Sequence, residues 1–440
     1  MNIISFLGTN KLIYLLLGVI VFIVFITVLI IIGRIGGGTF TAADLEFWGV
    51  FDTRQDFNNV IRTFQQANPG FKVNYRQFSY EDYEKSLIDA LASGTGPDII
   101  MMHHTWLAKH RDKFAPIPTS SNFENFKFMT SVDFKNQFVD VAYDDLVYQD
   151  KIYAMPLYVD SLALYYNKDM FNSVGIVRPP ETWEEFNKDA ELLTKFDSQG
   201  NIIQAGAAMG TSRNINRSTD ILAALMIQNG TRMTDPSNTT ATFTRAVDGI
   251  RVGENALEYY TDFSNPEKVV YSWNGDQHYS IDQFVEGRVA MMFNYSHQIP
   301  VVTGRFERLN FGIAPMPQFD RLNSKTYANY WAAAVSNSSP NKEAAWFFLS
   351  YLVSTEGTRQ YLADTSRPSA RRDIINIQRD DSKIGIFAVQ ALSAKSWFQV
   401  DNVAFDQIFA DMIDGVNIRK EKVRDALRSA EAKISVLMSK

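Results

Sequence analysis

Two groups of polar and aromatic side chains have the residue types that bind a small polar molecule. In the first group, Asp52 and Arg54 follow an apolar stretch, and an ionised carboxylate makes stronger hydrogen bonds to hydroxyl groups than a neutral acceptor does. In the second group, His104, Thr105 and Trp106 combine hydrogen-bonding groups with a large flat ring. Each group has a structural alternative, because Asp52 could cap the next helix and Trp106 could pack between helices.

A metal site is a further possibility for the second group, since three of the five histidines lie between residues 103 and 110. We do not expect zinc there, because adjacent histidines in an extended segment point apart and one ion rarely binds both. The sequence therefore predicts a site without a metal or other cofactor.

The pattern around these residues predicts alternating strands and helices. Apolar residues in 45–48, alternating ones in 71–75 and the run 98–102 indicate three strands. Apolar residues at helical spacing in 57–64 and 83–91 indicate a helix between each pair of strands. Such a series forms a parallel sheet covered by helices, and ligands bind outside the carboxyl ends of its strands. Both polar groups directly follow a predicted strand, so we expect them at one edge of the sheet.

Later segments show clear helix starts. Thr182 and Glu185 have the spacing of a capping box, and Ser339-Pro340 predicts the start of another helix. Apolar residues from Val423 to Leu437 trace one helical face near the end of the chain.

The composition excludes several classes of function. The chain has 43 Lys and Arg residues against 49 Asp and Glu residues, a net charge of −6, and no basic tract, so we expect no nucleic-acid binding. It contains no Cys, which excludes disulfides and thiolate metal sites. The sequence has no phosphate-binding G-x-x-x-x-G-K-[ST] motif, no G-x-S-x-G and no H-E-x-x-H. We therefore expect a binding protein and not an enzyme.

The N-terminal segment predicts a membrane anchor. Residues 12–33 (LIYLLLGVIVFIVFITVLIIIG) are uncharged and long enough to cross a bilayer. A cleavable signal peptide has a shorter apolar stretch, and TAAD at 41–44 is a poor cleavage site, so we favour a retained anchor within residues 1–33. A flexible Gly-rich spacer follows in residues 34–44. Basic residues tend to lie on the cytoplasmic side of a membrane helix. Lys11 precedes this segment and Arg34 follows it, so the basic residues do not show on which side of the membrane the body lies.

From Leu45 to about residue 375, the chain resembles the bacterial extracellular solute-binding proteins of the maltose-binding type. No single segment is specific, and the resemblance depends on the order and spacing of several segments. These are LEFWGVFD (45–52), FQQANPGFKVNY (64–75), YEDYEKSLIDALASGTGPDII (80–100), IYAMPLYVDSLALYYNKDMF (152–171), PPETWEEF (179–186), FVEGRVAMMFNYS (284–296), YWAAAVSNSSPNKEAAWFFLSYL (330–352) and RPSARRD (367–373).

The resemblance implies an α/β fold of the type II-like periplasmic-binding-protein class, in which two lobes are joined by a hinge of several chain crossings. It assigns 45–158 and 315–356 to the first lobe, and 159–314 and 357–440 to the second. The implied crossings lie near 158–160, 314–318 and 352–361. Ligand binds between the lobes, which close over it by hinge motion.

The resemblance also implies a role outside the cytoplasm. Proteins of this type capture a sugar or oligosaccharide and deliver it to an ABC-type permease, whose ATPases are separate chains. We expect a monomer held at the cell membrane by its single N-terminal helix. Many members of the family carry a lipidated Cys, and this chain departs from them in its anchor.

The resemblance places further residues in the cleft between the lobes. Asp160 occupies the position of a ligand-contacting acid at the first crossing, and Tyr158, two residues earlier, faces the same side. The alternative for Asp160 is a hinge carboxylate bonded to backbone, and for Arg372 it is a surface ion pair. The remaining residues implied at the cleft are Arg213, Asn214, Asp220, Asn294, Tyr295, His297, Trp331 and Arg372.

Three other functions stay open from the sequence. The chain could bind a peptide or polyol in place of a sugar, or it could be a surface adhesion module that has lost transport. A glycoside hydrolase is a third alternative, and it would need two carboxylates on either side of one bond.

Overall fold

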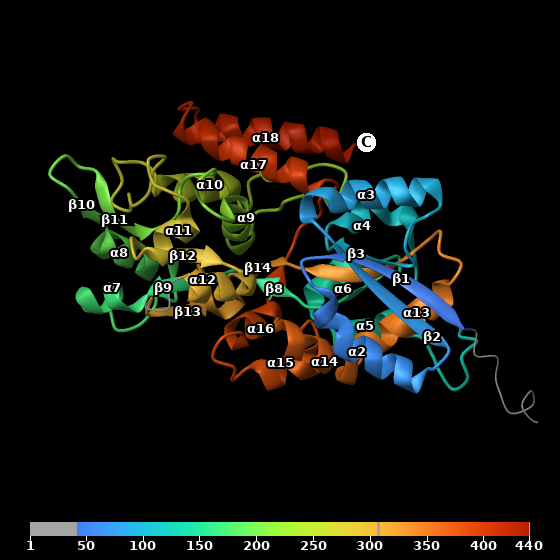
Figure 1. The fold of residues 1–440 in the computed structure, drawn as a ribbon. Helices are drawn as coiled ribbons and strands as arrows, with labels where there is room; N and C mark the ends of the chain where they lie inside the picture. The colour runs from blue at the N-terminus through green and yellow to red at the C-terminus, as the bar shows by residue number, and fades with distance from the viewer. Residues whose placement is uncertain (1–41, 306–308, 440) are drawn as a thin grey trace, which may run out of the picture.

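Two hydrophobic cores divide the chain into two lobes, which lie side by side in Figure 1. The computed structural model describes residues 42–305 and 309–439. The anchor predicted within residues 12–33 lies outside these ranges. In the part of the chain that the structure describes, no helix has both the length and the apolar composition needed to span a bilayer.

The first lobe is built around a sheet with the strand order β2-β1-β3-β15-β4, and β7 also pairs with β15. β1 runs parallel to β2 and β3, as the alternating strand–helix pattern predicts, whereas β15 runs antiparallel to β3. The strands are β1 (Ala43–Val50), β2 (Phe71–Phe78), β3 (Ile99–His103), β4 (Phe114–Ala115), β7 (Ala154–Pro156) and β15 (Trp331–Ser336).

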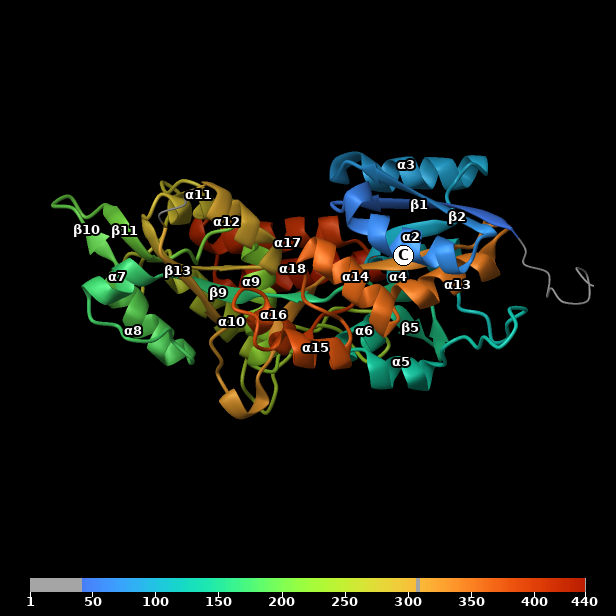
Figure 2. The ribbon, with the colours of Figure 1, turned by 60° about the horizontal axis from the view of Figure 1, so that its bottom comes forward.

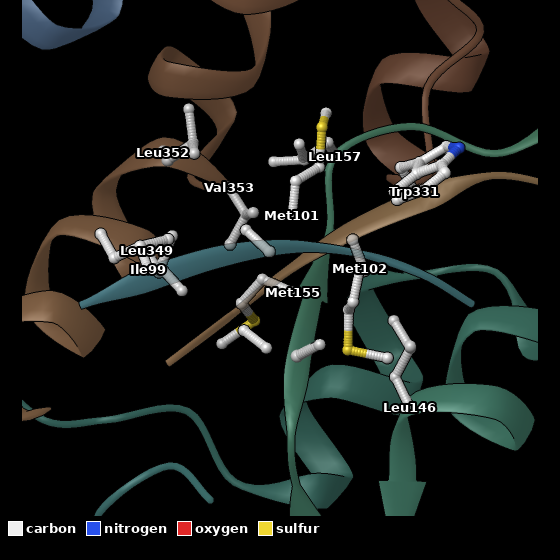
Figure 3. Packing of buried hydrophobic residues seen from close by; sticks show 14 of the residues in the cluster. Ile99, Met101, Met102, Leu146, Met155, Leu157, Trp331, Leu349, Leu352 and Val353 are labelled. Atoms are coloured by element: carbon white, nitrogen blue, oxygen red, sulfur yellow. The ribbon is translucent and has the colours of Figure 1, made fainter. Parts of the chain in front are cut away.

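Helices bury their apolar sides against this sheet. α2 (Arg54–Ala67) follows β1 and buries Phe57, Val60 and Ile61 at the predicted spacing. Figure 3 shows Met101 and Met102 on opposite sides of β3, with Met102 directed toward Leu146. The other helices of this lobe are α3 (Tyr80–Ser93), α4 (Trp106–His110), α5 (Ser131–Gln137), α6 (Asp140–Leu146), α13 (Lys342–Leu352), α14 (Thr355–Thr365) and α15 (Arg372–Gln378).

The second lobe has its own sheet, with the strand order β10-β11-β12-β9-β13. Its strands are β9 (Ala163–Asn167), β10 (Lys195–Phe196), β11 (Ile202–Ala207), β12 (Val289–Asn294) and β13 (Phe311–Pro315). Its helices are α7 (Lys168–Ser173), α8 (Trp183–Leu193), α9 (Ser218–Gln228), α10 (Val252–Asp262), α11 (Ser280–Val285), α12 (Ile299–Arg305), α17 (Asn402–Asn417) and α18 (Val423–Met438). α8 begins as predicted, since the side chain of Thr182 accepts a hydrogen bond from the Glu185 N–H.

A small sheet of order β16-β14-β8 lies between the lobes. It consists of β8 (Asp160–Ser161), β14 (Thr326–Asn329) and β16 (Ala394–Lys395), and Figure 1 shows β8 and β14 between the two larger sheets. α16 (Gly385–Ala391) packs against β8 and β13, and Figure 2 brings it to the front together with α14 and α15. These elements form the hinge.

The core residues place the chain crossings more closely than the resemblance does. Val159 belongs to the first core and Leu162 to the second, which agrees with the crossing predicted near 158–160. The next crossing comes at Tyr327–Ala328 instead of 314–318. The reason is that β13 stays paired with β9, so the segment after it remains with the second lobe.

The third crossing also lies later than the predicted 352–361. Tyr361 and Ile375 still pack in the first core. Ile384 packs in the second core, Ala388 to Ala394 contact the first again, and Trp397 lies in the second. The ring of Tyr361 stacks on Phe57 of α2 at 5.2 Å, and this contact holds α14 on the first lobe. The segment 357–375, which the resemblance assigns to the second lobe, therefore packs with the first.

Candidate ligand-binding cavity

A cavity of about 460 Å³ lies between the lobes. The first lobe contributes residues that follow β1 and β3, the second lobe contributes residues of α9 and α17, and the hinge contributes residues of β8 and β14. The loops that follow β1 and β3 both reach the cavity. This agrees with the prediction that ligand binds outside the carboxyl ends of the parallel strands.

Three aromatic rings form one wall of the cavity. Phe51 and Tyr80 stack at 5.5 Å with an angle of 24° between their planes, and Trp331 meets Phe51 edge-on at 5.6 Å. Phe51 is 52 % exposed and Tyr80 46 % exposed, whereas Trp331 is buried behind them. Phe51 also has a φ of 63°, a left-handed conformation that costs roughly 1 kcal/mol in a residue with a side chain. The backbone is thus held in a costly conformation that presents an apolar ring to the cavity.

Asp160 combines the two roles that the sequence left open. Its Oδ1 accepts hydrogen bonds from the backbone N–H groups of Ser161 at 2.9 Å and Ser296 at 3.1 Å. Its Oδ2 accepts from the Ser296 hydroxyl at 2.7 Å and lies 3.7 Å from Nδ1 of His297. The carboxylate is therefore bonded to backbone at the hinge, and it also lines the cavity together with His297.

The second lobe presents two acids and one arginine to the cavity. Burial raises the pKa of Asp220, whose Oδ2 accepts a hydrogen bond from the Tyr295 hydroxyl at 2.8 Å. Burial and the nearby Asp220 charge raise the pKa of Asp406 to about 7. Nε of Arg217 is buried and has no hydrogen-bond partner among the described residues. This arginine can donate hydrogen bonds to a ligand, and the two acids can accept them.

His103 and His104 close another side of the cavity. His103 bonds through Nδ1 to the Thr105 hydroxyl at 2.8 Å, and burial lowers its pKa well below the usual value. His104 bonds through Nδ1 to Oδ2 of Asp145 at 2.9 Å and stacks on Tyr330. The two rings lie 4.4 Å apart and do not point apart as expected for an extended segment, because the chain turns at His104.

Arg367 reaches the cavity from the first lobe through a buried network. Its guanidinium lies 4.3 Å from the ring centre of Tyr158, and both residues line the cavity. Asp52, behind them, forms an ion pair with Arg367 and accepts a hydrogen bond from the Tyr361 hydroxyl at 2.8 Å. Asp52 therefore positions Arg367 and does not itself line the cavity. Thr53, and not Asp52, is the N-cap of α2.

Seven of the residues predicted from the sequence line the cavity: His104, Thr105, Tyr158, Asp160, Asp220, His297 and Trp331. Arg54 is exposed on the first turn of α2. Trp106 is buried next to the cavity wall, 5.4 Å from Trp331 and stacked on Tyr83.

The other predicted residues have structural partners. Asn294 donates to Oδ1 of Asn216 at 3.0 Å, and Tyr295 supports Asp220 as described above. Arg213 forms ion pairs with two acids of α17, and Asn214 donates to the backbone carbonyls of Asn274 and Gln277. Arg372 forms the surface ion pair with Asp140 that was its alternative.

Several cavity residues were missed from the sequence. Phe51 directly precedes Asp52, and Arg217 lies three residues before Asp220, so each is a near neighbour of a residue that the sequence predicts. The N-terminal part of α17 gave no signal, because the resemblance thins beyond residue 375. The missed lining residues are Phe51, Tyr80, His103, Arg217, Tyr327, Asn329, Arg367, Gln399, Asn402 and Asp406.

The comparison with known families decides the class of protein. Residues 59–383, most of the chain, match the family described as bacterial extracellular solute-binding protein. The chain belongs to this family. The family confirms the prediction of a binding protein that does not transform its ligand, and it confirms the predicted resemblance.

Individual relatives of this solute-binding protein are distant. The multiple sugar-binding protein of Streptococcus mutans is 22 % identical over 327 residues, which are 72 % of each chain. The maltotriose-binding protein of Pyrococcus abyssi is 22 % identical over 323 residues, 70 % of this chain and 62 % of the relative.

Solved structures share the two-lobed fold. The cyclic alpha-maltosyl-1,6-maltose binding protein of Arthrobacter globiformis has a TM-score of 0.72 at 17 % identity, covering 90 % of this chain and 99 % of that one. A cyclo/maltodextrin-binding protein solved with maltotetraose has a TM-score of 0.71 at 19 % identity, covering 89 % and 96 %. At this identity the likeness establishes the fold, which is the predicted α/β two-lobed class.

Proposed function

We propose that this solute-binding protein captures a sugar or oligosaccharide between its lobes and delivers it to an ABC-type permease. The observation that carries this proposal is the mixed lining of the cavity. Exposed rings of Phe51 and Tyr80 lie beside the carboxylates of Asp160, Asp220 and Asp406.

This combination suits the chemistry of a sugar. A sugar ring has apolar C–H faces, which pack on aromatic rings, and hydroxyl groups around its edge. Arg217 can donate to those hydroxyls, and the carboxylates can accept from them. A cavity of about 460 Å³ also falls within the size range of small-molecule sites.

The relatives support the same class of ligand. Two proteins similar to this chain are named for multiple sugars and for maltotriose, and similar structures were solved with maltotetraose and with mannobiose. Of the residues predicted from the sequence, we assign ligand contact to the seven that line the cavity.

The location of the protein is part of the proposal. The family is extracellular, and residues 12–33 are uncharged and apolar over a length that crosses a bilayer. We propose that this segment tethers the body to the outer face of the cell membrane as a single-pass anchor, and that the protein acts as a monomer.

A thermal-shift and calorimetric screen of the full-length chain tests the ligand class. Saturating amounts of the correct oligosaccharide, in large excess over Kd, should stabilise the fold by roughly 3–4 kcal/mol. Phe51→Ala should weaken binding by at least tenfold, since it removes an exposed stacking ring. Phe196→Ala is the matched control, because Phe196 is also exposed but lies on β10, away from the cavity.

The contrary result is equally clear. A stabilising ligand found among peptides or polyols, with no response to any saccharide, would refute the carbohydrate assignment. Cleavage products after incubation with oligosaccharides would refute the binding role itself.

A further inference from the structure

A second hollow of about 800 Å³ adjoins the cavity and is rich in cations. Four basic residues line it, namely Arg111, Arg232, Lys325 and Lys395, and we refer to it as the basic groove. His104, Thr105 and Gln399 line both the basic groove and the cavity, so the two hollows are separated by no more than these side chains.

The cations of the basic groove exceed its acids. Asp144 and Asp145 are the acids in its lining. Asp145 is already used, since it accepts hydrogen bonds from His104 and from the hydroxyls of Tyr330 and Ser396. Asp144 lies 4.0 Å from Nζ of Lys395. The four basic side chains thus face two acids, both of which have partners within the protein.

Most of these cations have no acidic partner of their own. Among the residues that the structure describes, neither Arg232 nor Lys325 forms an ion pair, and Nζ of Lys325 has one long contact of 3.4 Å to a backbone carbonyl. Arg111 lies 4.0 Å over the ring of Tyr148, which leaves its guanidinium edge free to pair. The basic groove therefore offers charge to a group from outside the chain.

The cavity has the opposite balance. Asp160, Asp220 and Asp406 line it, Asp52 neutralises Arg367, and Arg217 is the cation among the described lining residues whose charge faces Asp220 and Asp406. The cavity holds three acids beside Arg217, whereas the basic groove holds four basic side chains beside two acids, so an anionic group is favoured in the basic groove. The sign of the charge changes along the space between the lobes.

We propose that the ligand is an acidic oligosaccharide, with neutral rings in the cavity and a carboxylate or sulfate-ester substituent in the basic groove. This inference rests on the proposed sugar-binding function and names the chemical class of the sugar. Planar guanidinium groups bind carboxylates and sulfates in a two-pronged manner, and lysine adds a point charge.

The position of the cations couples the acidic group to lobe closure. Arg111 follows α4 in the first lobe, Arg232 follows α9 in the second, and Lys325 and Lys395 belong to the hinge region. An anion in the basic groove is attracted from both lobes at once, which favours their closed arrangement.

Calorimetry on the full-length chain tests this inference with matched pairs of oligosaccharides. Each pair has the same length and linkage, and one member carries a uronic acid carboxylate or a sulfate ester. We expect tighter binding of the acidic member, with the advantage shrinking as salt rises. The double variant Arg232→Gln/Lys325→Gln should weaken binding of the acidic member by about tenfold and leave the neutral member unchanged.

The control variant removes the same charge from elsewhere between the lobes. Arg359 and Lys383 line a different hollow on the side of α14 and α15, and Arg359→Gln/Lys383→Gln should leave both affinities unchanged. The carboxylate and sulfate pairs, read separately, tell which anion is used.

Three results would overturn the inference: acidic members that bind no tighter than neutral ones, a groove variant that weakens both members alike, or a control variant that matches the groove variant. If neutral saccharides bind and acidic ones do not, this inference alone fails. If no saccharide of either kind binds, the proposed function fails with it.

Discussion

Asp52 is buried behind the cavity and influences the ligand site through Arg367. The sequence singled it out as a carboxylate at a strand end, which is correct for its place in the chain. Its partners Tyr361 and Arg367 come from more than 300 positions away, and no local pattern connects them. The type of residue at the site was therefore predictable, whereas its partner and its distance from the ligand were not.

Replacing Asp52 tests its role as the partner of a buried cation. Asp52→Asn keeps the volume but leaves Arg367 unpaired in a largely buried position, and we expect a loss of about 3 kcal/mol in the free energy of unfolding. Urea denaturation measures this loss. Asp44→Asn is the control, because the Asp44–Lys72 pair is exposed, and its loss should stay below about 1 kcal/mol. Equal effects of the two variants would contradict the buried network.

Asp406 should make stability depend on pH. Its pKa in the folded protein is about 7, raised from 3.8 by burial and by Asp220. Between these values the folded state holds a proton that the unfolded state releases, so stability falls as pH rises from about 4 to about 7. Asp406→Asn removes this pH-dependent loss of stability. The free energy of unfolding of the variant, measured by urea denaturation, should therefore increasingly exceed that of the natural protein as pH rises from about 4 to about 7. Parallel stability profiles for Asp406→Asn and the natural protein would refute the raised pKa of Asp406.

At the scale of elements, local patterns were informative. The spacing of Phe57, Val60 and Ile61 predicted α2, because an amphipathic helix buries a regular series of residues. α13 begins at Lys342, two residues after the predicted Ser339-Pro340 start. In contrast, α17 brings Asn402 and Asp406 to the cavity only through packing between helices. The sequence of one helix does not show against which other helices it will pack, so this position could not be predicted.

Contact between α8 and β11 depends on a glycine. A Cβ atom on Gly206 would lie 2.0 Å from the carbonyl oxygen of Ala190, so Gly206→Ala must move the backbone. We expect a loss of about 1–3 kcal/mol in the free energy of unfolding. Gly304→Ala in α12 meets nothing within 4 Å and should gain about 0.5–1 kcal/mol from helix propensity. Urea denaturation of both variants measures the difference, and a neutral Gly206→Ala would contradict the close packing.

At the scale of the whole molecule, the resemblance predicted two lobes and a hinge, and the crossings were predicted less well. The crossing predicted near Asp160 agrees with the change of core between Val159 and Leu162. The two later crossings were displaced because segments 318–326 and 357–375 are held by tertiary contacts such as the Tyr361–Phe57 stack.

An ion pair joins the two lobes beside the cavity. Lys109 of α4 lies 3.2 Å from Asp401, the N-cap of α17, and 2.8 Å from Glu84 of its own lobe. Lys109→Met keeps the aliphatic stem and removes the link, so we expect ligand affinity to fall up to about fivefold through faster dissociation. Stopped-flow binding measures the rates. Lys72→Met, which breaks a pair within the first lobe, should leave them unchanged, and an unaltered Lys109→Met would show that the link does not hold the lobes.

The place of β15 in the first sheet has a consequence for how the protein is made. This strand inserts between β3 and β4 although it is synthesised long after both. A nascent chain emerging from the ribosome therefore cannot complete its first core until all strands of the second sheet have been translated. During that interval the polypeptide lacks a finished N-terminal half. The strand order itself thus delays completion of the first lobe until every strand of the second sheet has been synthesised.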